Sequence, residues 1–412
     1  MGNVVAIISE YNPFHKGHAY QMGFIRRDFG EDTTVIAIMS GNYTQRAEVA
    51  FADKLLRATA AVESGVNLVL ELPFPYSCAS AESFARAGVA IADALGIVDY
   101  ISFGSELGRT DELQTIADNM MSAKFKEALA IAQKNTEFAN LGYPVLAEKV
   151  YSKLFGETDQ RITSPNNVLA LEYLKALSEL KSSIRPHTIK RYGADYNKVD
   201  LDENELPSAS AIREAFASGD LSAFDYTTDS AKSLFLKAYN SGDIPCDTER
   251  LSTAIISNFR LNPTPNKKIL DAEGGLYNRL ARLSFETDSI TSLTALAQTK
   301  KYTTARIRRA TLFSFLGVTS SDVKTLPRYT QVLAMDTIGS KALKSIKKSS
   351  SISIITKPSV TKGLDDIALK QKRLSDKADS VFQLTKPQIT SGAYHLTFTP
   401  YVKSDDFCDI LS

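Results

Sequence analysis

The N-terminal stretch, residues 1–27, constrains the fold more than any other part of the chain. Residues 4–8 are apolar and mostly β-branched, which is typical of a strand buried on both faces of a parallel sheet. Asn12-Pro13 breaks this strand into a turn, and residues 19–27 then have the spacing of an amphipathic helix. Such a strand, loop and helix start form a site for an anion, because free backbone N–H groups and the helix dipole point at the loop.

The loop in this unit carries the tetrapeptide His15-Lys16-Gly17-His18, which holds two of the chain's 4 histidines. Gly17 would let a phosphate approach the backbone closely, and the histidines would add imidazole donors from the same side. In this setting the His-x-Gly-His pattern resembles the nucleotidyltransferase superfamily, which adenylylates substrates with ATP. A helix-capping loop with incidental imidazoles would explain the tetrapeptide alone.

Further apolar stretches that predict buried strands lie at residues 33–39, 67–72 and 98–103. Helical periodicity appears at residues 51–63, with Asp53, Lys54 and Arg57 on the polar face, and at residues 79–95. Strands and helices alternate as in βαβ units, so we expect an α/β fold with a doubly wound parallel sheet. Ligands of such sheets bind beyond the C-terminal ends of the strands, where the loops that start at residues 9, 40 and 104 would meet.

The remainder of the chain predicts mostly helices. Residues 111–154 read as a helical insertion, and the later helical segments lie at 168–180, 234–239, 251–259, 275–283, 292–316 and within 360–379. Residues 184–191 could form a strand, and residues 327–333 a short strand or turn. Because the alternation is lost from about Leu221, we expect two domains, a catalytic ATP-binding domain at 1–225 and a mainly α-helical, basic C-terminal domain at 226–412.

The charge is uneven although the net charge is only +1. Residues 296–373 contain 16 Lys and Arg against 4 Asp and Glu, which suggests a polyanionic partner docking on one face. The stretch 299–309 mixes basic side chains with a tyrosine, a combination that suits phosphate contacts and base stacking. Four lysines at roughly helical spacing give another basic face, Lys341, Lys344, Lys347 and Lys348. An ordinary solvated surface would have the same composition.

Several function classes find no support in the sequence. Cys78, Cys246 and Cys408 have neither a disulfide pattern nor zinc-ligand spacing, so we expect no protein-held metal site. No apolar run approaches membrane length and no secretory signal opens the chain, so we expect a soluble cytoplasmic protein with no membrane partner. His187 and His395 stand alone and are interpreted as structural.

Taken together, motifs along most of the chain are similar to one family, the bacterial tRNA(Met) cytidine acetate ligases. The motifs lie at residues 10–18, 39–46, 103–106, 165–167, 190–196, 208–213 and 299–309. The resemblance implies a Rossmann-like nucleotidyltransferase fold of the HUP type. It also implies an ATP-dependent ligase that acetylates N4 of the wobble cytidine, C34, in elongator tRNA(Met), with ATP, acetate and this tRNA as substrates.

The resemblance also implies site residues, with His15 and His18 as the catalytic pair. The ATP-binding residues would be Ile8, Ser9, Glu10, Tyr11, Asn12, Pro13, Phe14, His15, Lys16, Gly17, His18, Ala19, Tyr20, Gln21, Gly104, Asn166, Arg191, Ser208, Ser210 and Arg213. The tRNA-binding residues would be Lys300, Lys301, Arg306 and Arg309. The chain departs from the family at Lys16, where Asn is usual, and at residues 47–49, where Ala-Glu-Val replaces Gly-Glu-Pro.

We expect acetate to attack the α-phosphate of ATP, giving acetyl-adenylate and pyrophosphate, before the cytidine amine attacks the acyl carbon. The histidines would steady the α-phosphate, and Arg191 and Arg213 would hold the outgoing phosphates with Mg²⁺ bound through the phosphates. Gly104 would leave room for the nucleotide and Asn166 would hydrogen-bond it. Two alternatives stay open: a small-molecule adenylyltransferase of the pantetheine-phosphate or nicotinamide-mononucleotide type, and a non-catalytic RNA-binding protein.

Overall fold

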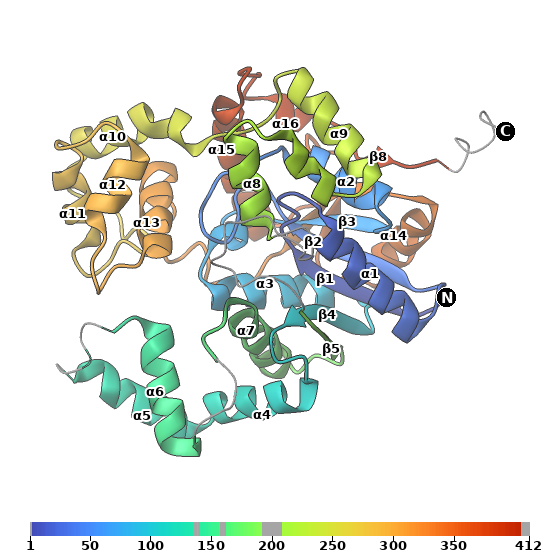
Figure 1. Ribbon diagram of the computed structural model, residues 1–412, viewed down its shortest axis with the longest axis horizontal. Coiled ribbons are helices and arrows are strands. Elements are labelled where there is room, and N and C mark those ends of the chain that lie inside the picture. The colour runs from blue at the N-terminus through green and yellow to red at the C-terminus, as the bar shows by residue number, and fades with distance from the viewer. Residues whose placement is uncertain (1, 136–137, 139–140, 157–161, 192–207, 405–412) are drawn as a thin grey trace.

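The computed structural model describes residues 2–135, 138, 141–156, 162–191 and 208–404. These residues form one mixed sheet of eight strands in the order β5-β4-β1-β2-β3-β6-β7, with β8 also paired to β6 (Figure 1). The strands are β1 (Val4–Ser9), β2 (Thr34–Ser40), β3 (Leu68–Leu72), β4 (Tyr100–Ser105), β5 (Arg185–Lys190), β6 (Tyr329–Met335), β7 (Ser353–Ile355) and β8 (Tyr401–Val402). The five strands from β5 to β3 are parallel, as expected, and β6 runs antiparallel to β3.

Helices cover both faces of the sheet. The helices of the first half of the chain are α1 (Lys16–Phe29), α2 (Lys54–Glu63), α3 (Ala81–Ala94), α4 (Thr110–Met121), α5 (Ala123–Lys134), α6 (Tyr143–Phe155), α7 (Pro165–Leu180) and α8 (Ala209–Ala217). Those of the second half are α9 (Asp229–Asn240), α10 (Ser252–Leu261), α11 (Leu276–Leu283), α12 (Ile290–Ala297), α13 (Thr304–Leu316), α14 (Thr337–Ser349), α15 (Asp366–Phe382) and α16 (Tyr394–Thr397).

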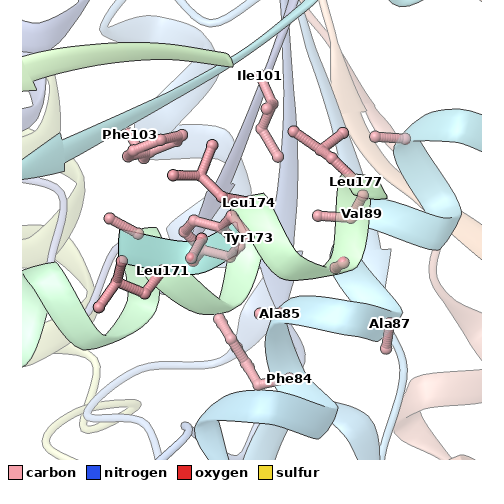
Figure 2. Packing of buried hydrophobic residues seen from close by; sticks show 14 of the residues in the cluster. Phe84, Ala85, Ala87, Val89, Ile101, Phe103, Leu171, Tyr173, Leu174 and Leu177 are labelled. Atoms are coloured by element: carbon pink, nitrogen blue, oxygen red, sulfur yellow. The ribbon is translucent and has the colours of Figure 1, made fainter. Parts of the chain in front are cut away.

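Alternate residues of the buried strands separate two hydrophobic cores. Ala6, Ile36 and Leu70 face α3, α7 and α14, and this core is shown around Phe84 and Leu174 in Figure 2. The neighbouring residues of the same strands pack against α1 and α2 on the opposite face. This two-sided burial explains why the strands are apolar throughout, the pattern that predicted a doubly wound sheet.

The helices α10 to α13 form a separate body whose core reaches back to the first half of the chain. Tyr43, Val49 and Phe74, from the loops after β2 and β3, belong to the same hydrophobic cluster as these helices and α15. Chain beyond this body returns to the sheet as β6, α14 and β8 (Figure 1). The second half is therefore mainly helical but adds β6, β7 and β8 to the sheet beyond β3, and the antiparallel pairing of β6 with β3 was not predicted.

One expectation about local structure was wrong, and one predicted helix has an unusual environment. Residues 292–316 do not form one helix: Thr299 Oγ1 accepts the Tyr302 N–H at 3.1 Å, and Thr303 caps a new helix, so the segment divides into α12 and α13. The polar face of α2 does not meet solvent, because Lys54 and Arg57 are 3% and 0% exposed. In the sequence, a threonine that ends a helix cannot be distinguished from one inside a helix. A buried lysine or arginine likewise cannot be distinguished from one at the surface.

The buried Lys54 joins the two halves of the chain. Its Nζ donates to Glu71 Oε1 at 2.7 Å on β3 and to Asp379 Oδ2 on α15. Asp379 Oδ1 also accepts a hydrogen bond from Asn42 Nδ2 at 2.8 Å. Burial tends to lower the pKa of Lys54, but the two carboxylates outweigh it and raise that pKa, so the ammonium stays charged. The polar face of α2 thus anchors α15.

Candidate active site

The two motif histidines hold their own loop against the start of α1. His15 is the N-cap, and its Nδ1 accepts the Gly17 N–H at 3.0 Å. Nδ1 of His18 accepts the His15 N–H at 3.2 Å, so the pair forms a capping box built from imidazoles. The ring centroids lie 3.9 Å apart. The rings therefore do cap the helix, and each uses only its Nδ1 edge to do so.

Both rings are neutral and carry their proton on Nε2. A ring nitrogen that accepts a backbone N–H carries no proton itself, which leaves Nε2–H as a donor. Burial, with the positive charges of Arg191 and Arg213, lowers the pKa of His15 to about 3. Burial and the neighbouring His15 and Arg191 lower the pKa of His18 well below its ordinary value. At physiological pH each histidine is thus a neutral N–H donor.

Gly17 is required by the His15 ring. A Cβ at position 17 would lie 2.7 Å from His15 Cε1 and 2.9 Å from its Nδ1, too close for any side chain. From the sequence, we expected Gly17 to leave room for a phosphate. In the structure, the group that approaches it is the imidazole of His15. A side chain here would displace the ring that caps α1.

Arg191 comes to the histidines from the end of β5 and is oriented by a short chain of polar groups. Its Nη1 donates to Asn166 Oδ1 at 3.0 Å, and Asn166 Nδ2 donates to Glu106 Oε1 at 2.7 Å. A Cβ on Gly104 would lie 3.0 Å from Arg191 Cγ. Gly104 thus leaves room for the arginine stem, and Asn166 positions that arginine, roles the sequence did not indicate.

Glu106 is a positioning residue that the site prediction missed. Its carboxylate accepts the N–H groups of Asn166 at 3.2 Å and Asn167 at 2.8 Å, which caps the N-terminus of α7. The residue lies in the 103–106 motif, directly after β4. The position of Glu106 at the end of a strand could have marked it as a site residue. Its capping of α7 could not be predicted, because the two segments lie 60 residues apart in sequence.

The serine and arginine residues of α8 divide between two cavities. Ser208 caps α8 by accepting the Ala211 N–H at 3.2 Å, and it lines the same cavity as His15. Arg213 Nη1 donates to the Asn12 carbonyl at 2.8 Å, and its Nη2 lies 3.5 Å from Glu48 Oε2. Arg213 thus braces the histidine loop, and with Ser210 it lines a second, larger cavity.

The cavity beside the histidines has a volume of about 340 Å³, within the usual range for small-ligand sites. The predicted residues that line it are Ile8, Ser9, Glu10, Tyr11, Asn12, His15, His18, Gln21, Gly104, Asn166, Arg191 and Ser208. The predicted residues outside its lining are Pro13, Phe14, Lys16, Gly17, Ala19, Tyr20, Ser210 and Arg213. Phe14 belongs to the core under α1, and the side chains of Lys16 and Tyr20 are exposed.

Gln45 and Arg46 also line this cavity, although neither was predicted as a site residue. The Gln45 N–H donates to Glu10 Oε1 at 2.6 Å. Burial raises the pKa of Glu10, opposed by this hydrogen bond and by the charge of Arg213. The only signal was their position in the loop after β2, on the edge where ligands were expected.

The buried Arg57 fixes the loops around the cavity. Its guanidinium donates to the carbonyls of Ala52 at 2.9 Å and Ser40 at 3.2 Å, and also to those of Glu10 and Gly41. Burial lowers its pKa to about 10, which still leaves it charged at neutral pH. The C-terminal ends of β1 and β2 are thus tied to one side chain, which makes the cavity wall rigid.

The predicted tRNA-binding residues do not form one exposed set. Arg306 donates to the carbonyls of Asp271 and Glu273, both at 3.0 Å, and Arg309 Nε lies 2.6 Å from Asp271 Oδ2. Lys300 and Lys301 are exposed, although Lys301 Nζ donates to the Gly274 carbonyl at 3.2 Å. The role of these four residues in binding RNA stays a prediction.

The basic stretch 296–373 is also divided in space. Helix α13 belongs to the α10–α13 body, whereas α14 packs on the sheet, and the two lie toward opposite ends of the long axis in Figure 1. The lysines of α14 are exposed, as expected for a basic face. The basic side chains thus lie in two different parts of the molecule, and the docking of a polyanionic partner on them stays a prediction.

Some sequence features lie outside the described residues or have no counterpart in them. Cys408 and residues 192–196 of the 190–196 motif are among the residues left undescribed. In the described part of the chain, no group of three or more His, Cys, Asp or Glu residues could hold a metal ion. Within the same residues, no helix has both the length and the apolar character needed to cross a membrane.

Comparison with known proteins agrees with this geometry. The sequence model of the family described as HIGH Nucleotidyl Transferase matches residues 2–395. The tRNA(Met) cytidine acetate ligase of Thermoanaerobacter sp. (strain X514) is 36% identical over 364 residues, which cover 87% of this chain and 90% of that protein. The enzyme of the same name from Clostridium perfringens (strain ATCC 13124) is 34% identical over 375 residues, covering 87% and 91% of the two chains.

Solved structures agree as well. The crystal structure of Thermotoga maritima TmcAL bound with alpha-thio ATP is 27% identical and superposes with a TM-score of 0.87, covering 98% of this chain and 100% of that one. The apo form of the same protein gives a TM-score of 0.90 over the same shares of the two chains. The family predicted from the motifs is therefore confirmed. The chain belongs to the HIGH nucleotidyltransferases and, among them, to the tRNA(Met) cytidine acetate ligase family.

Proposed function

We propose that this protein is an ATP-dependent ligase that activates acetate as acetyl-adenylate and acetylates N4 of C34 in elongator tRNA(Met). One observation carries the ATP half of the proposal. Two neutral imidazoles, each with Nδ1 occupied by a backbone N–H and Nε2–H left as donor, line a cavity together with Arg191. Family membership supplies acetate and the tRNA as the other substrates.

The first step needs donors that do not change charge as the reaction proceeds. A carboxylate oxygen of acetate attacks the α-phosphorus, the bond to the bridging oxygen of the β-phosphate breaks, and pyrophosphate leaves with that electron pair. The Nε2–H groups of His15 and His18 hydrogen-bond the phosphate oxygens on which charge builds up. Such fixed donors typically contribute about 2.7–4 kcal/mol each to transition-state stabilisation.

Arg191 is the cation best placed to hold the phosphates, because Glu106 and Asn166 fix its guanidinium beside the histidines. Arg213 acts mainly through the loop, since it binds the Asn12 carbonyl. Among the residues that line this cavity Glu10 is the only carboxylate, and it already accepts the Gln45 N–H. A Mg²⁺ ion would therefore be held by ATP phosphates and would supply charge neutralisation.

In the second step the exocyclic amine of cytidine attacks the acyl carbon of acetyl-adenylate. The new N–C bond forms, the C–O bond to AMP breaks, and N4 gives up one proton to solvent. The mixed anhydride is reactive enough that no further nucleophile is needed. This fits the described residues, in which burial raises the pKa of the Cys78 and Cys246 thiols and leaves them un-ionised.

The test is to incubate the purified protein with ATP, Mg²⁺, labelled acetate and total tRNA, and to identify the labelled nucleoside. We expect label in N4-acetylcytidine from elongator tRNA(Met), with AMP and pyrophosphate released in equal amounts. Pyrophosphate release stimulated by phosphopantetheine or nicotinamide mononucleotide, and not by acetate, would replace the proposal with the adenylyltransferase alternative. ATP binding without any release would favour the non-catalytic one.

A further inference from the structure

A second cavity of about 990 Å³ lies next to the histidine site and has no role in the steps above that involve ATP. Its walls come from both halves of the chain: the loop after β2 and helix α8 on one side, and helices α12 and α13 on the other. Arg46 lines both cavities, and Ser208 and Ser210 of α8 line one cavity each. The two cavities are therefore neighbours that meet at Arg46 and the first turn of α8.

The carboxylate of Glu48 is fixed in the wall of this larger cavity. Arg308 of α13 donates to its Oε1, and Arg213 of α8 lies 3.5 Å from its Oε2. Its side chain is still 28% exposed. Because an ionised carboxylate can accept about four hydrogen bonds, these two partners leave it with capacity for a ligand. Arg213 also binds the Asn12 carbonyl, so one side chain links Glu48 to the histidine loop.

Two threonine residues of the same wall have hydroxyl groups that are buried within the protein. Thr294 of α12 and Thr311 of α13 are 7% and 2% exposed, and both line the cavity. Neither hydroxyl has a hydrogen-bond partner among the described residues. Because both oxygens are also closed off from the cavity, the polar character of this wall comes from Glu48 and its two arginine partners.

Resting on the proposed function, we propose that the larger cavity is the subsite for the acceptor nucleoside, and that Glu48 accepts a hydrogen bond from the cytosine N4 amine. Carboxylates are the side chains that suit this amine, and single-stranded RNA bases are read along such edges when they leave the stack. Uracil has a carbonyl at the same position, so it would set an oxygen lone pair against the carboxylate and be rejected. The site thus selects cytidine before acetyl transfer.

Two neighbouring residues of α12 provide a matched test of the cavity. Ala295 lines it, whereas Leu296 is 44% exposed and is not part of its lining. We expect Ala295→Trp to lower the rate at which labelled acetate enters tRNA at least tenfold, with ATP affinity by calorimetry unchanged within twofold. Leu296→Trp should change neither quantity. Equal acetylation rates in the two variants would overturn the assignment of the cavity.

Glu48→Gln tests the carboxylate itself, even where a tryptophan variant fails to fold. The readout is the KM for elongator tRNA(Met) with C34 compared with the Ki of a transcript carrying uridine at that position. Because glutamine can donate to the uracil carbonyl, the preference for C34 should fall at least tenfold. A merely structural role would weaken both transcripts equally, which would overturn the inference. Failure of the unaltered protein to label any tRNA would instead overturn the proposed function.

Discussion

Residues 8–21 and residues 299–309 are both short stretches in which chemistry-bearing side chains follow one another, yet the structure uses them differently. In the first, both histidines and most of the predicted residues line one cavity. In the second, Arg306 and Arg309 bind the chain at residues 271–273, so that of the four predicted tRNA-binding residues only Lys300 and Lys301 are exposed. The difference is where the partners come from. The two histidines cap α1 through hydrogen bonds within three residues, whereas the arginines bind partners 33–38 residues away in sequence.

The same contrast predicts which substitution destabilises the fold most, namely one in a buried ion pair that joins segments far apart in sequence. Removing the Asp379 carboxylate should lower the free energy of unfolding by about 3–5 kcal/mol, because Lys54 stays buried with one partner fewer. Denaturant unfolding of Asp379→Ala measures this loss. Asp366→Ala on the same helix is exposed and should cost less than about 1 kcal/mol. Equal losses in the two variants would mean that the buried cluster is not an anchor.

Much of the architecture was predictable because it depends on local patterns. Apolar runs predicted four of the five parallel strands, residues 184–191 were named as a possible strand where β5 lies, and the turn after β1 with its histidines predicted the candidate site. What was missed depends on contacts between distant segments. Strand β6 becomes the antiparallel neighbour of β3 only because the chain returns to the sheet there, and Glu106 becomes a helix cap only because β4 ends beside α7. Lys54 and Arg57 have the spacing of a solvated face, and nothing near them in sequence reveals Glu71 or Asp379.

Substitutions in the histidine loop should lower the catalytic rate more than they lower the stability of the fold. His15→Asn keeps an N-cap oxygen for α1 but removes the Nε2–H donor, and His18→Ala removes the other donor. Each should lower kcat/KM for acetate-dependent ATP turnover about 10²- to 10³-fold, as for the loss of one fixed transition-state donor. Gly23→Ala serves as the control, since a Cβ there meets no atom within 4 Å. Full activity in both histidine variants would refute their catalytic role.

The next largest effect should be a loss of stability in acid, because both histidines are neutral in the folded protein. The pKa of His15 is lowered to about 3, so between about pH 6 and pH 4 the unfolded chain binds a proton there that the folded chain does not. Stability must therefore fall as the pH falls, by about 1.4 kcal/mol per pH unit for this residue. Urea titrations of the unaltered protein and of His15→Asn should diverge by that slope. Parallel curves would show that His15 titrates normally.

The smallest effect should come from the basic stretch at residues 299–309. Lys300→Glu combined with Lys301→Glu should weaken tRNA binding and make the dependence of log K on log salt shallower by about 1.4 to 1.8 units, if each lysine contacts one phosphate. ATP binding should not change. Lys344→Glu combined with Lys347→Glu on α14 makes the comparison decisive, because it alters the same charge at the far end of the molecule. A shallower slope for the α14 pair alone would indicate that tRNA docks on the side of the sheet covered by α14. Residues 299–309 would then have only the structural role that Arg306 and Arg309 already perform.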